Sequence, residues 1–271
     1  MITNQYYKNK STILKNIFNT DNIKIDINKI TIDNVSYRVE NDVIILHEDV
    51  PITKVQKKTV ETFGQEWTEF NRITTEHYSE FENYFDIVNI KKLEGKNVID
   101  FGCGIGRWSK ILADKVNLNC LILFDYSNSI YIARENFREY NNVIFFKGDI
   151  EKIAFAKDSF SFFLCLGVLH HLPKREKNVL KKIHHSSKEG LIYLYYNLEN
   201  RIFLYKILFH ISNFFRKILS RSRFHKFNIF LSYLITIFFY YPFIWINRIF
   251  SFFNLHFINL PLSFYLNSSF F

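Results

Sequence analysis

The stretch that decides the fold is residues 97–107, N-V-I-D-F-G-C-G-I-G-R, where a short apolar run meets a turn containing three glycines. A strand that turns directly into a helix needs glycine, because glycine adopts positive φ and lets the backbone approach a ligand closely. The spacing is G-x-G-x-G, since Arg107 stands at the third glycine position of the dinucleotide pattern. The loss of the dinucleotide spacing disfavours NAD as the ligand. Asp100, two residues before the first glycine, places negative charge beside the ligand and favours a cationic one. The alternative is a tight turn with a purely structural role.

Four further apolar runs follow this turn, with helical segments between several of them. The runs lie at residues 119–125, 142–147, 160–166 and 191–196, and helices are expected at 105–115, about 127–140 and 174–188. Apolar strands that alternate with helices are typical of a parallel sheet covered on both faces. The sequence therefore predicts an α/β fold.

The residues before the turn predict smaller elements. Residues 1–20 are polar and poorly patterned, whereas residues 23–46 alternate β-branched with polar residues, which predicts short antiparallel strands. Apolar residues recur at helical spacing between Ile73 and Leu93, which predicts a helix that Gly95 ends.

The formal net charge of +9 is unevenly distributed along the 271 residues. Residues 1–190 hold 27 Lys/Arg and 25 Asp/Glu, whereas residues 191–271 hold 8 and 1, together with 26 of the 50 aromatic residues and no glycine. The basic residues of the second region cluster beside a long uncharged run and do not form a stripe with spaced aromatic residues. Nucleic acid is therefore not expected as a partner.

The aromatic-rich region leaves three interpretations open. Residues 200–220 place polar side chains at steps of three and four, which is typical of an amphipathic helix. Residues 227–247 carry no formal charge, and Pro242 is expected to interrupt them. The region suits a helical lid on the core, an interfacial element attracted to anionic lipid, or a membrane span. Peripheral membrane contact through residues 201–260 is thus one expected interaction.

The cysteines indicate neither a metal site nor a disulfide framework. Cys103, Cys120 and Cys165 are isolated, without a C-x-x-C pair, and suit a reducing cytosol. The first residues lack the apolar core and cleavage site of a secretory signal. We expect a cytoplasmic protein, peripheral to a membrane if the aromatic-rich region is interfacial, with no bound metal.

Taken in order, several motifs resemble those of the class I S-adenosylmethionine-dependent methyltransferases, over about residues 60–200. Residues 98–107 resemble the first motif of that family, which cradles the methionine part of the cofactor. The resemblance implies that this stretch binds S-adenosyl-L-methionine through Asp100, Gly102, Cys103, Gly104 and Gly106.

Later motifs continue the resemblance. Asp125, at the end of the second run, matches the acidic residue that holds the ribose hydroxyls in this family. Asp149 and Ile150 resemble the motif that reads adenine, with Asp149 accepting from the adenine amino group. Residues 166–173, which begin with Leu166, resemble the segment that lines the methyl-transfer site.

The resemblance also implies how the chain is organised. It predicts a Rossmann-like class I methyltransferase sheet with a small N-terminal β unit and a helical C-terminal appendage. The expected regions are residues 1–56 for the N-terminal tail and β unit, 57–200 for the S-adenosylmethionine-binding core, and 201–271 for the lid or membrane-associating appendage.

Other features suggest a subgroup of type 11/12-like methyltransferases, often met near bacterial polysaccharide genes. Residues 63–67, F-G-Q-E-W, are similar to a segment before the core in that subgroup, whose zinc cysteines this chain lacks. Ser161 replaces a usual Asp, and Gly190 stands where a Gly pair is usual. Family sheets end with a late antiparallel hairpin, and no sequence after Phe271 supplies it, so we expect a chain truncated at its C-terminus.

Two histidines are the catalytic candidates. His170 and His171 follow the fourth strand, at the sheet edge where ligands of α/β proteins bind, and one of them could orient or deprotonate an acceptor. The alternative is that each is an ordinary loop histidine.

The resemblance implies methyl transfer to a small-molecule or glycan-type acceptor. The missing final strands leave open a non-catalytic cofactor-binding or membrane-adaptor remnant of a methyltransferase. A hydride-transfer enzyme is the third hypothesis.

Overall fold

The computed structural model describes residues 4–46, 73–172 and 175–194, and parts of 203–252. The described parts of the last range are residues 203, 206–207, 209–211, 213–214, 230–231, 233–234 and 236–252. The chain divides into two compact units, Met1–Tyr195 and Tyr196–Phe271. Each unit is described by itself.

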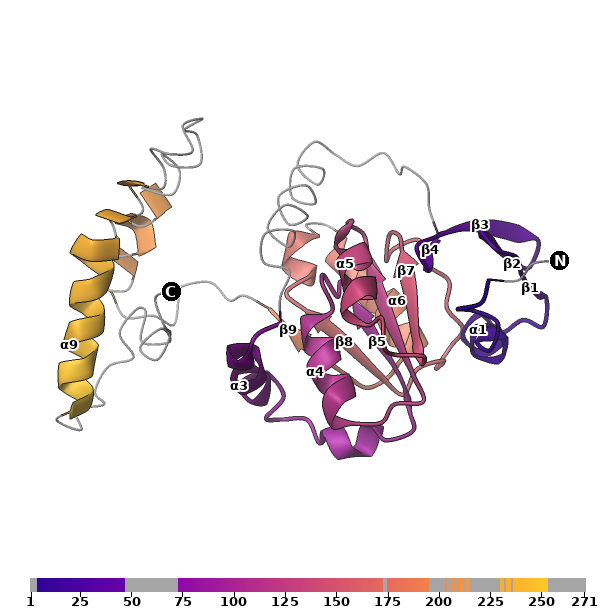
Figure 1. Cartoon of the computed structure of the whole chain (residues 1–271), viewed down its shortest axis with the longest axis horizontal. Helices are drawn as coiled ribbons and strands as arrows, with labels where there is room; N and C mark the ends of the chain where they lie inside the picture. The colour runs from indigo at the N-terminus through magenta and orange to yellow at the C-terminus, as the bar shows by residue number, and fades with distance from the viewer. Residues whose placement is uncertain are drawn as a thin grey trace. The chain divides into compact units, whose positions relative to one another are not determined.

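The first unit is built on a nine-stranded sheet with the order β1-β2-β3-β4-β7-β6-β5-β8-β9 (Figure 1). Its strands are β1 (Ile23–Ile25), β2 (Lys29–Ile32), β3 (Val35–Glu40), β4 (Val43–Ile45), β5 (Asn97–Phe101), β6 (Cys120–Asp125), β7 (Val143–Lys147), β8 (Phe162–Leu166) and β9 (Gly190–Tyr193). The strands from β5 to β9 are mutually parallel and follow the spatial order third, second, first, fourth, fifth. This is the Rossmann-like, doubly wound arrangement, so the predicted fold class is confirmed.

Helices cover both faces of this sheet, and side chains alternate between the two cores. The helices are α1 (Ser11–Phe18), α3 (Thr75–Tyr84), α4 (Arg107–Lys115), α5 (Ser129–Asn136) and α6 (Glu176–Ser186). On β5, Val98 belongs to the core that α3, α4 and α5 cover, whereas Ile99 belongs to the core that α1 and α6 cover. The continuous apolar runs are explained by this burial on both faces.

The N-terminal residues are more ordered than their composition predicts. The expectation of a poorly patterned start was wrong, because α1 buries Leu14 and Ile17, three residues apart on one helix face. The strands β1–β4 form the predicted antiparallel meander. This meander continues the main sheet, because β4 pairs in parallel with β7 through Val43 and Phe145.

The helix expected between Ile73 and Leu93 is divided. Helix α3 ends at Tyr84, and a separate 3-10 turn covers Ile90–Leu93. The backbone N–H of Val88 donates to the Phe85 carbonyl at 2.9 Å, so the chain turns where apolar spacing alone predicted a continuous helix. Val88 packs against the core from this turn, which explains the misleading pattern.

The described part of the second unit is helical. A π-helical turn covers Thr236–Tyr240, and α9 covers Tyr241–Phe252. Pro242 is the second residue of α9, directly after the π-helical turn, so the helix continues through the residue where an interruption was expected and changes from π to α geometry just before it. Most of residues 200–229 lies outside the described residues. In the part of the chain that the structure describes, no helix has both the length and the apolar character needed to cross a membrane.

Candidate functional site

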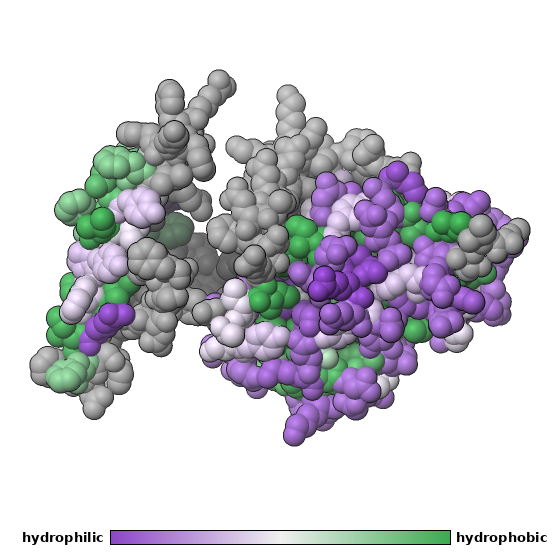
Figure 2. All heavy atoms as spheres, viewed as in Figure 1, coloured by the Kyte–Doolittle hydropathy of each residue, from purple (hydrophilic) through white to green (hydrophobic). Residues whose placement is uncertain are grey.

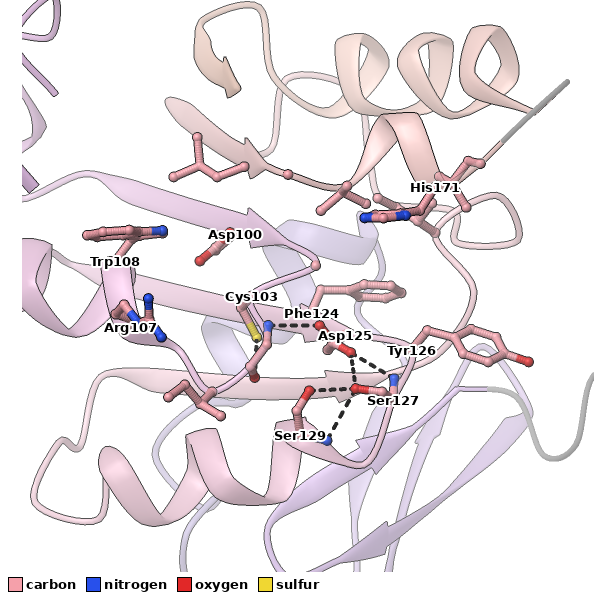
Figure 3. Close-up of a pocket in the computed structure, with 18 of the residues that line it drawn as sticks. Asp100, Cys103, Arg107, Trp108, Phe124, Asp125, Tyr126, Ser127, Ser129 and His171 are labelled. Carbon is pink, nitrogen blue, oxygen red and sulfur yellow. Dashed lines mark hydrogen bonds between the residues drawn. The ribbon is translucent and has the colours of Figure 1, made fainter. Parts of the chain in front are cut away.

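A pocket of about 340 Å³ lies at the carboxyl ends of the parallel strands (Figure 3). Its walls come from the segments that follow β5, β6, β7 and β8, and from α3 and α4. The strand order reverses between β5 and β8, and ligands of doubly wound proteins bind in the crevice outside such a reversal.

Most of the predicted cofactor residues line this pocket. They are Asp100, Gly102, Cys103, Gly104, Asp125, Asp149, Ile150 and Leu166. Gly106 does not line the pocket but caps the N-terminus of α4. Of the two histidines, His171 lines the pocket and His170 does not.

The glycine turn is close-packed and needs glycine for conformational reasons. Gly102, Gly104 and Gly106 have φ values of +75°, +56° and +75°, in the left-handed region. A Cβ on Gly102 would lie 2.3 Å from the Val168 side chain, which comes from the segment after β8. The turn therefore fits against the opposite wall of the pocket only when this residue has no side chain.

The Asp125 carboxylate joins two walls of the pocket. Its Oδ2 accepts from the Gly104 backbone N–H at 2.8 Å. Its Oδ1 accepts from the Ser127 backbone N–H and from the Ser127 hydroxyl, each at 2.7 Å. Because a carboxylate offers about four acceptor positions, one position remains on Oδ2.

Asp100 is a buried acid at the floor of the pocket. Its side chain accepts from the Ser109 hydroxyl of α4 at 2.6 Å. Burial raises the pKa of Asp100 to about 7, against the lowering effect of the Ser109 hydrogen bond. Asp100 can therefore change its charge near neutral pH, and a cation in the pocket would favour its ionised form.

An arginine spans two acids at the other end of the pocket. One Arg175 nitrogen, Nη2, donates to both oxygens of Asp149 at 2.7 Å. The Arg175 Nε donates to Glu151, which lies two residues after Asp149 in the sequence. Arg175 is the N-cap residue of α6, so this cluster joins the segment after β7 to α6.

The two histidines lie side by side, with ring centroids 4.0 Å apart. Burial lowers the pKa of His171, and the charge of His170 lowers it further. Burial also lowers the pKa of His170. Both rings are therefore mainly neutral at neutral pH, the form in which an imidazole accepts a proton.

The wall from α3 and α4 was not predicted. It contains Glu80, Tyr84, Arg107 and Trp108. The Tyr84 and Trp108 rings are stacked with centroids 4.7 Å apart, and Tyr193 of β9 lies 4.7 Å from Tyr84. Trp108 comes directly after the glycine turn, and this position could have identified it as a pocket residue. Helix α3 lies about twenty residues earlier in the chain, and no motif there indicated a contact with the pocket.

Other residues of the pocket were also missed. They include Phe124, Tyr126, Ser127, Ser129 and Arg175, whereas Gly167, Val168 and Leu172 belong to the segment 166–173 that was expected to line the site. Ser127 follows a predicted residue and stabilises the turn after β6, whereas Arg175 reaches the pocket across 26 residues of sequence from Asp149. Among the described residues, no three His, Cys, Asp or Glu side chains are grouped as a metal site.

Part of the chain is similar to a known protein family. Residues 98–190 match a family model described as a methyltransferase domain. No curated protein matches the chain. The matched residues run from β5 to the start of β9 and include every strand whose end contributes to the pocket.

Several solved structures are similar to this chain. Phosphoethanolamine N-methyltransferase 1 of Haemonchus contortus, in complex with phosphoethanolamine and S-adenosylhomocysteine, is 20% identical with a TM-score of 0.40, over 53% of this chain and 33% of that enzyme. A Pyrococcus horikoshii protein is 22% identical with a TM-score of 0.38, over 45% and 60%. A Methanococcus maripaludis protein considered an S-adenosylmethionine-dependent methyltransferase is 15% identical with a TM-score of 0.43, over 71% and 89%.

These structural similarities carry no information on the activity of this chain, which spans only 33% of the Haemonchus enzyme and 60% of the Pyrococcus protein. The match to the family model is independent of them and coincides with the part of the sheet that holds the pocket. This chain therefore contains, at residues 98–190, a region similar to the methyltransferase domain family, built on a doubly wound parallel sheet.

Proposed function

We propose that this chain binds S-adenosyl-L-methionine in the pocket after β5–β8 and transfers its methyl group to a small-molecule or glycan-type acceptor. The observation that carries the proposal is the convergence of the glycine turn, Asp125 and Asp149 on one pocket. The family match over residues 98–190 supports the same reaction class.

The pocket residues fit such a cofactor in polarity. Asp125 keeps one acceptor position on Oδ2, which suits a ribose hydroxyl, because its other positions are used by Gly104 and Ser127. Asp149 and Ile150 offer an acceptor and an apolar surface for adenine. Leu166 adds apolar wall on the β8 side.

The methionine end of the cofactor is assigned to the glycine turn. Gly102, Cys103 and Gly104 line the pocket there, and Gly106 starts α4, whose first N–H groups suit a carboxylate. Burial raises the pKa of the Cys103 thiol well above its usual range, so this side chain stays neutral. Asp100 supplies negative charge for the cationic groups of the ligand.

The bound cofactor supplies an electrophilic methyl group, and the task of the chain is to orient donor and acceptor. His171 is the candidate base for an acceptor that must lose a proton, because its ring lines the pocket and its lowered pKa keeps it neutral. We assign His170, which lies outside the pocket lining, the secondary role of packing against the His171 ring, with ring centroids 4.0 Å apart.

Calorimetric titration of the full chain with S-adenosylhomocysteine tests this proposal without knowledge of the acceptor. We expect saturable binding with one ligand per chain. Absence of binding by a sample with a cooperative unfolding transition would contradict the proposal.

We further propose that the aromatic-rich region makes peripheral contact with an anionic membrane surface. The exposed side chains of α9 include Trp245, Ile249, Phe250 and Phe252. Figure 2 shows hydrophobic residues along the described part of the second unit, whereas the visible face of the first unit is mainly hydrophilic. Residues 191–271 carry a net charge of +7, which favours anionic lipid.

Vesicle flotation tests the membrane contact. We expect the full chain to float with vesicles containing phosphatidylglycerol and to float less with pure phosphatidylcholine. A chain that stays in solution with both vesicles would favour the alternative, a lid on the protein itself.

A further inference from the structure

We propose that Arg175 is a positioning residue for recognition of the cofactor base, because it holds the Asp149 carboxylate with a single acceptor position left for the ligand. The inference rests on the proposed function, since it takes S-adenosyl-L-methionine as the ligand. Arg175 itself lines the pocket, and its role concerns base recognition and not the transfer of the methyl group.

The hydrogen bonds of Asp149 leave little freedom. Its Oδ1 accepts from Arg175 Nη2 at 2.7 Å and from the Glu151 backbone N–H at 3.0 Å. Its Oδ2 accepts from the same Arg175 nitrogen at 2.7 Å. A carboxylate offers about four acceptor positions, so one remains, and it lies on Oδ2. A single amino group of a base can use this position while the ion pair with Arg175 stays intact.

Arg175 is itself fixed from a second side. Its Nε donates to a Glu151 oxygen, and the other Glu151 oxygen accepts from the Asn178 side chain at 3.2 Å. Asn178 lies on α6, which Arg175 caps at its N-terminus. The guanidinium is therefore held between the segment after β7 and the first turn of α6, and its plane sets the orientation of Asp149.

Loss of Arg175 would change the chemistry of Asp149. The Asp149 side chain is 7% exposed, and Arg175 is its only ion-pair partner among the described residues. A buried carboxylate that loses its cation is no longer held in place and turns towards water. This change weakens the acceptor on Oδ2 that would meet the adenine amino group. Ligands without that amino group would be affected much less.

The test compares two ligands on the full chain by titration calorimetry. S-adenosylhomocysteine carries the amino group on its base, and S-inosylhomocysteine carries a carbonyl oxygen in its place. We expect Arg175→Met to weaken S-adenosylhomocysteine binding by about tenfold or more, the effect of one hydrogen bond to a charged group. Binding of S-inosylhomocysteine should change by less than about threefold, so the preference for adenine collapses.

Arg134 provides a matched control. Its Nε and Nη2 donate to Asp42 at 3.1 and 2.7 Å, in an ion pair that does not line the pocket. We expect Arg134→Met to lower the unfolding temperature and to leave the ratio of the two affinities unchanged. Glu151→Gln keeps the Arg175–Asp149 pair but weakens the second anchor of Arg175, because a neutral amide offers one oxygen where the carboxylate offers two. It should lower the adenine preference less than Arg175→Met, and it serves if that variant does not fold.

Three outcomes would overturn the inference. Equal weakening of both ligands by Arg175→Met would mean that Arg175 only stabilises the fold. Unchanged or tighter S-adenosylhomocysteine binding would mean that Arg175 is neutral or competes with the base. Failure of the folded wild-type chain to bind S-adenosylhomocysteine would contradict the proposed function, and with it this inference. The wild-type titration therefore tests the proposed function, and the variant titrations test the role of Arg175.

Discussion

Replacement of Asp125 by asparagine probes the link between the glycine turn and cofactor binding. Both Asp125 oxygens accept a backbone N–H, Oδ2 from Gly104 and Oδ1 from Ser127. An asparagine side chain has one oxygen and one NH2 group, so in either orientation an NH2 group faces a backbone N–H. One backbone donor therefore loses its partner in Asp125→Asn.

The magnitude follows from the hydrogen bonds. Asp125 is 8% exposed, and a buried donor left without a partner destabilises a protein by about 1–3 kcal/mol. For a unit of this size the expected decrease in unfolding temperature is about 2–4 °C per kcal/mol. The single acceptor position left on Oδ2 limits the ligand to one charge-assisted hydrogen bond, worth about 1.5–3 kcal/mol, so S-adenosylhomocysteine should bind about 10–100-fold more weakly.

Asp114 is the matched control for this variant. Its carboxylate likewise accepts three hydrogen bonds, here from the side chains of Lys110, Tyr78 and Tyr140, but it does not line the pocket. We expect Asp114→Asn to lower the unfolding temperature and to leave the affinity for S-adenosylhomocysteine within about twofold of wild type. If Asp125→Asn also retained its affinity within about twofold, the assignment of Asp125 to the ligand would be refuted.

Three further predictions concern stability. Burial raises the pKa of Asp100 to about 7, so its contribution to stability is present at acidic pH and is lost as the pH rises through 7. Thermal unfolding between pH 5 and 8 should show this decline in the wild-type chain and not in Asp100→Asn. Burial lowers the pKa of Lys10 to about 7, so the unfolded chain binds more protons between pH 7 and 10.5 and stability should rise with pH there; Lys10→Met should be more stable at pH 7 and lack this rise. Gly102→Ala should lower stability by about 1–3 kcal/mol and abolish S-adenosylhomocysteine binding, because φ is +75° and the new Cβ meets Val168; a variant with wild-type stability would contradict the close packing of the turn.

The parallel sheet could be predicted well because its signal is local. The run at residues 97–101 coincides with β5, and the run at 142–147 differs from β7 by one residue. Such runs are short, apolar and bounded by turns, since both of their faces are buried. Helix starts were less accurate, as α4 begins at Arg107 and not at Ile105, because the positive φ of Gly106 places the cap there.

The pocket could be predicted only in part. Asp100 and Asp125 were found because they end strands whose carboxyl ends must meet at one sheet edge. Arg175 and Tyr84 were missed because they reach the pocket from a loop and from a separate helix, and their partners are distant in sequence. The Arg175–Asp149 ion pair depends on the packing of α6 against the sheet, which no local pattern encodes.

The central claim is that the cofactor occupies the pocket with its ribose on Asp125 and its base at Asp149. A crystal structure of the full chain with S-adenosylhomocysteine tests it most directly. The account predicts a ribose hydroxyl within hydrogen-bond distance of Asp125 Oδ2 and the adenine amino group within such distance of Asp149 Oδ2, with the Arg175 ion pair intact. A ligand bound elsewhere, or bound here with its base at the glycine turn, would contradict it.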